Sequence, residues 1–258
     1  MNLKQAILSA LAVMAVAVAG WFAYPYLGEK PHEPEPLFAD WAAVVIAGDW
    51  RAHNGQPSEV FDNGRREIAK KLISVGFRPS NILQFSVRPE RYAAERVQPS
   101  TGEAITNGMT ELARRALGGC LLYLTSHGTP QGVIIGDRLV DPPPLADLID
   151  LACGDRPAVA VISACFAGQF IGPMQGPRHV IFTAARPDRT SFGCGEADEF
   201  TFFDACMVQE FDRAGNFSEL ATRVDDCVRR RETQMMVDAP SEPQFFLGPE
   251  VAYTLNWR

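Results

Sequence analysis

LLYLTSHG at residues 121–128 decides the fold of this 258-residue chain, together with VAVISACFAG at residues 159–168. Each stretch begins as a continuous apolar run, which is typical of a strand buried on both faces of a parallel sheet. The first run leads directly into His127, and the second leads into Cys165. Because the carboxyl ends of parallel strands meet at one edge of a sheet, we expect these two side chains to lie at the same edge.

The remainder of the chain alternates short apolar runs with longer amphipathic segments. This alternation implies right-handed strand–helix–strand crossovers and therefore an α/β fold, with a mainly parallel sheet that has helices on both faces. A small hairpin is expected over 132–140, turning at Gly136-Asp137. Strands are expected at 42–47, 81–87, 121–125, 158–163, 180–184 and 244–247, and helices at 58–75, 101–117, 144–152, 199–212 and 218–237.

Cys165 and His127 together have the chemistry of an activated thiol. A neighbouring imidazole or a helix N-terminus lowers the pKa of a cysteine and supplies a thiolate nucleophile. A short helix is expected at 166–170, directly after Cys165, and the backbone N–H groups of Gly128 and Cys165 are candidates for an oxyanion hole. Taken alone, such a cysteine is usually a buried small side chain and such a histidine a turn residue. Their position at the ends of consecutive strands favours a catalytic pair.

These motifs resemble those of the cysteine peptidase clan that contains legumains, caspases, gingipains and the catalytic subunit of the GPI transamidase. LLYLTSHG is similar to the histidine motif of the clan, and VAVISACFAG to its cysteine motif. VVIAGDWRAHN at 44–54 is similar to the first strand and loop of the legumain-type family, C13, and a bacterial group of C13-like membrane proteins shares TAARPDRTSFGC at 183–194.

The resemblance implies a caspase-like three-layer α/β/α fold and a cysteine endopeptidase. Cys165 would attack a peptide carbonyl to form an acyl-enzyme, and His127 would protonate the leaving amine. Water completes the turnover in a hydrolase, and an amine completes it in a transamidase. No metal or organic cofactor is implied, and the expected substrate is a peptide or protein.

The substrate pocket is less well marked. The resemblance assigns Arg51, which has Asp49 and His53 beside it, to the pocket for the residue before the cut, and this arginine would favour Asn or Asp substrates. Legumains have an acid two residues before the nucleophile, but this chain has Ser163 there. Asp188 or Glu196 is the alternative acid, and an acidic pocket would instead favour Lys or Arg.

Six cysteines are scattered along the chain with no CxxC pair and no zinc-ligand spacing, so a structural zinc site is not expected. An even count permits disulfides in an exported protein, but buried free thiols are the simpler expectation for most of the cysteines other than Cys165. No resolving cysteine is evident beside Cys165, which disfavours a thiol-redox protein. A catalytically silent scaffold of the same fold remains a further alternative.

The N-terminal segment predicts export. Residues 5–27 carry no charged side chain and would span roughly 35 Å as a helix, enough to cross a bilayer. We expect an uncleaved anchor over 1–27, a Pro-rich linker over 28–40 and a peptidase domain over 41–258. The domain is expected outside the cytoplasm, in the periplasm of a bacterium. Ala17-Val18-Ala19 resembles a cleavage site, so a removed signal peptide is the competing interpretation.

The charge of the chain excludes one class of partner. The formal net charge is −7, which gives no basic footprint for nucleic acid. No P-loop or dinucleotide-binding glycine motif follows a strand. The oligomeric state has no signature in the sequence.

Overall fold

The two stretches around His127 and Cys165 form neighbouring parallel strands at the centre of one sheet. In the computed structural model, which describes residues 35–258, they are β4 (Gly119–Thr125) and β8 (Ala158–Ser163). Their register pairs Thr125 with Ser163, so both strands end at the same level. Every residue of both strands is buried, as the uninterrupted apolar runs predicted.

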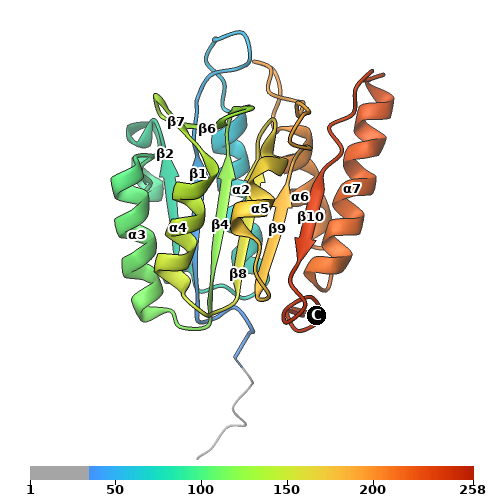
Figure 1. The fold of residues 1–258 in the computed structure, drawn as a ribbon. Helices are drawn as coiled ribbons and strands as arrows, with labels where there is room; N and C mark the ends of the chain where they lie inside the picture. The colour runs from blue at the N-terminus through green and yellow to red at the C-terminus, as the bar shows by residue number, and fades with distance from the viewer. Residues whose placement is uncertain (1–34) are drawn as a thin grey trace, which may run out of the picture. The chain divides into compact units, whose positions relative to one another are not determined.

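The sheet has seven strands in the order β10-β9-β8-β4-β1-β2-β3 (Figure 1). All neighbours are parallel except β10, which runs antiparallel to β9. A separate three-stranded antiparallel sheet contains β5, β6 and β7. The other strands are β1 (Trp41–Ala47), β2 (Ile82–Ser86), β3 (Gln98–Pro99), β5 (Gly128–Thr129), β6 (Gly132–Ile135), β7 (Arg138–Val140), β9 (His179–Thr183) and β10 (Gln244–Leu247).

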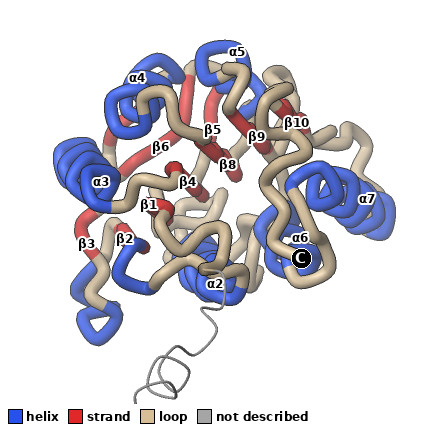
Figure 2. Tube along the Cα trace, turned by 90° about the horizontal axis from the view of Figure 1, so that it is seen from below, coloured by secondary structure: helices blue, strands red, loops and turns tan. Residues whose placement is uncertain are grey.

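Helices cover both faces of the central sheet, which gives three layers (Figure 2). Side chains alternate across each strand, so Ala43 and Val45 of β1 pack on one helical layer and Ala42 and Val44 on the other. The first layer contains α2 (Val60–Ser74), α6 (Phe202–Phe211) and α7 (Phe217–Gln234), and the second contains α3 (Gly102–Arg115), α4 (Pro142–Cys153) and α5 (Ile171–Met174).

Several helices begin where the sequence places a capping side chain. Thr101 accepts from the N–H of Ala104 at the start of α3, and Asn216 accepts from the N–H of Glu219 at the start of α7. The α/β fold with a mainly parallel sheet, predicted from the sequence, is confirmed. Strands β8 and β10 have their expected bounds, and the small hairpin turns at Gly136 as expected.

The short helix expected after Cys165 is only partly present. Phe166 adopts a left-handed conformation with φ of 59°, and a 3₁₀ turn, η4 (Ala167–Phe170), follows before the four-residue α5. A regular α-helix N-terminus therefore does not begin at the cysteine. Two further 3₁₀ segments, η2 (Pro79–Asn81) and η3 (Pro89–Glu95), flank β2.

The expectation of mostly free cysteines is wrong. Cys120 at the start of β4 is bonded to Cys153 at the end of α4, and Cys206 of α6 is bonded to Cys227 of α7. Each bond joins two elements that pack side by side. The bonded cysteines are 33 and 21 residues apart in the sequence, so no short motif indicates which cysteines pair. Only Cys165 and Cys194 remain free.

The predicted membrane anchor lies outside the described residues and stays a prediction. Between residues 35 and 258, no helix combines the length and apolar character needed to cross a bilayer. The sequence placed the start of the domain at residue 41, whereas packing begins slightly earlier. Phe38 is buried and its ring contacts Trp41 and Phe77, at centroid separations of 5.0 and 4.9 Å.

Candidate active site

A narrow crevice opens at the carboxyl edge of the sheet, where β4 and β8 end. His127 and Cys165, which the sequence predicted to meet here, both line it. The two strand ends are joined beyond the ladder because the N–H of Ser126 donates to the carbonyl oxygen of Ser163 at 3.1 Å. The other lining residues are Phe61, Ser126, Ser163, Ala164, Ser191, Phe192, Cys194 and Thr201.

The His127 ring is fixed by two contacts. Its Nε2 atom lies 2.9 Å from the carbonyl oxygen of Arg51, and its ring meets that of Phe61 edge-on with 5.0 Å between centroids. A carbonyl oxygen only accepts hydrogen bonds, so Nε2 carries the proton in the neutral ring and Nδ1 is left as the proton acceptor. This arrangement suits a general base that also returns a proton.

Cys165 is surrounded by backbone groups. The N–H of Ser191 donates to Sγ at 3.2 Å, and Sγ lies 3.6 Å from the carbonyl oxygen of the same residue. Burial raises the pKa of the Cys165 thiol, while the N–H groups of Ser191 and Gly128 oppose that shift by stabilising the thiolate. The N–H donors at the sulfur thus come from the loop at Ser191 and from the start of β5, in place of the expected α-helix.

Gly128 fills a position with no room for a side chain. A Cβ atom there would lie 2.0 Å from the carbonyl oxygen of Cys165 and 3.1 Å from the Cβ of Ala164. Glycine therefore allows the two strand ends to approach each other, and its N–H acts on the sulfur. The oxyanion hole expected from Gly128 and Cys165 stays a prediction.

Arg51 is not among the described residues that line the crevice, and it acts on the site through the carbonyl oxygen that contacts His127. Its guanidinium donates to both carboxylate oxygens of Asp49, at 2.9 and 3.2 Å, and this partner raises the pKa of the arginine. Asp49 is buried and also accepts the N–H groups of Trp50 and Arg51. The predicted pocket arginine thus reaches the site through the carbonyl oxygen that holds His127.

The other predicted pocket residues are divided between the crevice and the surface. Ser163 lines the floor of the crevice, with its Oγ 3.3 Å from the Oγ1 of Thr201. Asp188 lies on the surface, where both of its oxygens accept from Arg186 at 3.0 Å. Glu196 accepts from Asn54 at 2.5 Å. Neither acid is among the described residues that line the crevice.

A model of the peptidase C13 family matches residues 89–223, which is just over half of the chain and includes both His127 and Cys165. This chain belongs to the peptidase C13 family. Among solved structures it resembles caspase-1 from Spodoptera frugiperda, with a TM-score of 0.58 and 15% identity, over 86% of this chain and 93% of that one. That likeness shows a caspase-like fold. No curated protein matches the chain.

Sequence reasoning missed a buried carboxylate beneath the crevice of this C13 protein. Asp204 of α6 accepts from the hydroxyls of Tyr123 at 2.6 Å and Thr125 at 2.5 Å, and its N–H is capped by Thr201. Full burial raises the pKa of Asp204, and the hydroxyls around it, including that of Ser163, oppose the shift. Nothing in the sequence of α6 marks this carboxylate, because the two residues whose hydroxyls donate to it, Tyr123 and Thr125, are 81 and 79 residues away.

Cys194 is the second residue that the sequence did not assign. It lines the crevice with Cys165, so the expectation that no second thiol lies beside the nucleophile is wrong. The two cysteines are far apart in sequence and meet only because the loop after β9 returns over the strand end. Burial raises the pKa of Cys194 to about 11, and the charge of a Cys165 thiolate adds to the rise.

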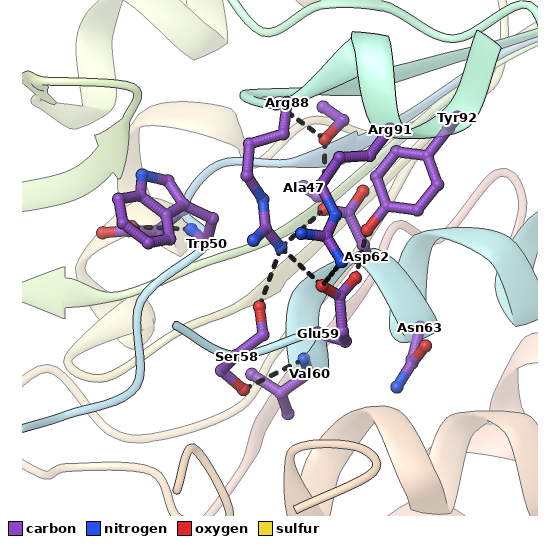
Figure 3. A network of polar contacts seen from close by, with 12 residues as sticks. Ala47, Trp50, Ser58, Glu59, Val60, Asp62, Asn63, Arg88, Arg91 and Tyr92 are labelled. Atoms are coloured by element: carbon purple, nitrogen blue, oxygen red, sulfur yellow. Dashed lines mark hydrogen bonds and ion pairs between the residues drawn. The ribbon is translucent and has the colours of Figure 1, made fainter. Parts of the chain in front are cut away.

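A network of charged side chains holds the loop that carries the Arg51 carbonyl (Figure 3). Arg88 donates to the carbonyl oxygen of Ser58 at 2.9 Å and to Glu59 at 3.1 Å, and Arg91 and Tyr92 also bond to Glu59. The Ser58 hydroxyl donates to the carbonyl oxygen of Gly195 at 3.3 Å. The network therefore ties the loop that orients His127 to the loop that carries Cys194.

Within residues 35–258, no group of three or more His, Cys, Asp or Glu side chains is arranged to hold a metal ion. The groups that line the crevice include two thiols, an imidazole and the hydroxyls of serine and threonine residues.

Proposed function

We propose that this protein is a cysteine endopeptidase that hydrolyses peptide bonds with Cys165 as nucleophile and His127 as its proton-transfer partner. The observation that carries the proposal is the crevice itself. It gathers the free thiols of Cys165 and Cys194, one oriented imidazole and backbone N–H groups around the ends of two adjacent strands. Membership of the peptidase C13 family supports the same reaction class.

The geometry supports a sequence of proton transfers in which no cofactor takes part. Burial keeps the Cys165 thiol protonated at rest, so His127 Nδ1 takes its proton as the sulfur attacks the substrate carbonyl. The N–H groups of Gly128 and Cys165 stabilise the oxyanion. His127 then gives the proton to the leaving amine. Water hydrolyses the thioester, and Cys165 regains its proton.

The crevice favours an uncharged polar side chain before the cut, and we assign asparagine as the preferred residue. The Ser163 and Thr201 hydroxyls line the floor, and the Asp204 carboxyl group lies behind them. Hydroxyl oxygens accept from the N–H₂ group of a carboxamide and bring no charge into the crevice. Since Asp49 already neutralises Arg51, the attraction for an acidic side chain is reduced.

Electrophilic peptide probes test the nucleophile. The full chain in detergent is treated with an epoxide or acyloxymethylketone peptide, and the adduct is located by mass spectrometry. We expect the adduct on Cys165, a loss of labelling on the order of 10²- to 10⁴-fold in His127→Ala, and retained labelling in Cys194→Ala as the matched control. Equal labelling of Cys165 and Cys194, unaffected by His127→Ala, would instead indicate a silent scaffold.

A peptide series tests the specificity and the acceptor. Quenched fluorescent peptides that differ only in the residue before the cut are compared at equal concentration, and Asn is expected to exceed Asp, Lys and Leu. Selective cleavage after Lys would contradict the assignment of the pocket. An amine added to the reaction distinguishes the alternative, because a transamidase would convert most of the acyl-enzyme into the amide product.

We further propose that the peptidase domain is exported and anchored by residues 5–27. The apolar N-terminal segment supports this location, and so do the two disulfides, since such bonds persist in oxidising compartments. A reporter fused after Arg258 is expected to be active only on the far side of the membrane. Activity confined to the cytoplasm would contradict the proposal.

A further inference from the structure

The crevice contains the only two cysteines of the chain that are not in disulfides. All six cysteines lie within the described residues, and four of them are paired in the body of the domain. The remaining two, Cys165 and Cys194, are half-buried and line one narrow space. Their arrangement provides both a reactive sulfur and a second sulfur that can react with it.

The loop that carries Cys194 is attached directly to the sulfur of Cys165. The N–H of Ser191 donates to Cys165 Sγ at 3.2 Å, and Cys194 lies three residues further along the same loop. Three residues span at most roughly 11 Å even when fully extended. The charge of a Cys165 thiolate also acts on Cys194, which independently indicates that the two sulfurs are close in a poorly solvated space.

The backbone around Cys194 has the freedom that a bond between the two sulfurs requires. Gly193 and Gly195 flank the cysteine, and Gly193 adopts a left-handed conformation with φ of 84°. The segment from 184 to 201 contains no helix or strand. A disulfide needs Cα atoms about 4.4–6.8 Å apart, and a glycine-flanked loop can move to that separation without disturbing the sheet.

We propose that Cys165 and Cys194 form a reversible disulfide when the protein meets a peroxide, and that this bond switches the crevice off. This inference rests on the proposed function, since the bond consumes the nucleophile of the peptidase. It assigns Cys194 as the resolving thiol. Cys194 is not a catalytic residue, because hydrolysis itself does not use it.

The bond forms in two balanced steps. The Cys165 thiolate attacks one peroxide oxygen, the S–O bond forms, the O–O bond breaks and hydroxide leaves. The Cys194 thiolate then attacks the sulfenic sulfur, the S–S bond forms and a second hydroxide leaves. With the two thiol protons, both hydroxides become water. The thiols together lose two electrons, and the peroxide is reduced to two molecules of water.

The contacts of the two thiols set the order of these steps. Cys165 receives the N–H of Ser191, and the N–H of Gly128 also favours its thiolate. Cys194 has a pKa raised to about 11, so its thiolate is scarce at neutral pH. Cys165 is therefore oxidised first. Condensation with Cys194 protects it from further oxidation to the sulfinic acid, which reductants do not reverse.

The test maps the sulfur chemistry of the full chain in detergent. The protein is exposed to hydrogen peroxide, digested without reductant and analysed by mass spectrometry, before and after treatment with dithiothreitol. In the wild type we expect a cross-linked Cys165–Cys194 peptide that dithiothreitol converts back to two thiols. Thr190→Ala, an exposed change in the same loop, is the matched control and is expected to behave like the wild type.

Cys194→Ala is expected to accumulate Cys165 with two added oxygens, and its recoverable Cys165 thiol should fall on the order of tenfold below that of the wild type. The proposal is overturned if the wild type gives no cross-linked peptide and reaches the sulfinic acid as fast as Cys194→Ala. The readout does not use turnover, so a cross-link in a protein without peptidase activity would contradict only the proposed function. Probe labelling of Cys165 without any cross-link would contradict only the switch.

Discussion

The cysteines in the body of the domain and those at its carboxyl edge have opposite fates. Cys120, Cys153, Cys206 and Cys227 are almost fully buried between packed elements, and each is bonded to a partner in the adjacent element. The two edge cysteines lie in loops, are half-buried and remain free. Whether a cysteine of this protein is bonded or free therefore depends on its place in the fold, in the packed body or at the carboxyl edge of the sheet. The spacing of the cysteines in the sequence does not distinguish the two groups.

In this C13 protein the bonded cysteines contribute to stability, and the free cysteines lie where the chemistry is expected. The body cysteines join β4 to α4 and α6 to α7, so they restrain the helical layers on both faces of the sheet. The edge cysteines line a crevice together with His127 and contribute no such link. Changes in the two groups should therefore affect different measurable quantities.

The largest expected effect comes from the edge. Cys165→Ala should lower kcat/KM by about a thousandfold or more, because the other thiol in the crevice, Cys194, has its pKa raised to about 11 and is scarcely ionised at neutral pH. Its melting temperature should change little, since the thiol is bonded only to backbone groups, those of Ser191 and Gly128, and forms no disulfide. Both quantities are measured on the same preparation, with a quenched peptide and by calorimetry. If Cys165→Ala retains peptidase turnover, Cys165 is not the nucleophile.

Removal of a body disulfide should produce the reverse pattern. Cys206→Ala with Cys227→Ala opens a bond between residues 21 apart, and the free energy of unfolding should fall by about 3–4 kcal/mol. Urea denaturation with and without dithiothreitol measures this, because the reductant can open two bonds in the wild type but only Cys120–Cys153 in the double variant, and should therefore weaken the wild type more. Loss of kcat/KM at a concentration of urea where the variant is still folded would contradict the separation of roles.

A change at the boundary between the two regions should have an intermediate effect. Gly128→Ala places a Cβ atom 2.0 Å from the carbonyl oxygen of Cys165, so the ends of β4 and β8 must move apart. A displacement of this kind can lower kcat about 100-fold. Gly172→Ala in α5 is the matched control, because its Cβ would have no neighbour within 4 Å. Equal activity of both variants would show that the close approach at Gly128 is not needed.

The sequence predicted those parts of the molecule that have a local pattern. Uninterrupted apolar runs marked the central strands, and the geometry of parallel sheets placed His127 and Cys165 at one edge. The sequence did not predict contacts between residues that are distant in the chain and become neighbours only when the helices and loops pack. Cys194 and Asp204 reach the crevice from distant segments, and the disulfides join elements that become neighbours only after folding.

Arg51 makes a local contact that its sequence position does not reveal. The sequence shows an arginine beside an aspartate, but it does not show that the loop folds the buried Asp49 carboxylate onto the guanidinium. Once that pair has formed, the carbonyl oxygen of Arg51 is what remains for the site. The sequence suggested that the guanidinium of Arg51 would bind substrate, whereas in the structure the guanidinium binds Asp49 and the carbonyl oxygen contacts His127.

The smallest expected effect separates the two edge cysteines from each other. Burial disfavours both thiolates, so the pKa of Cys165 is raised and that of Cys194 is raised to about 11. The rate of alkylation by iodoacetamide, followed by mass spectrometry at each thiol, should therefore rise with pH by about tenfold per unit across the neutral range. Cys165 should react first, because Ser191 and Gly128 stabilise its thiolate. A rate at Cys165 that is already constant from pH 6 upward would instead mean a resting thiolate–imidazolium pair, and His127 would then act only as an acid.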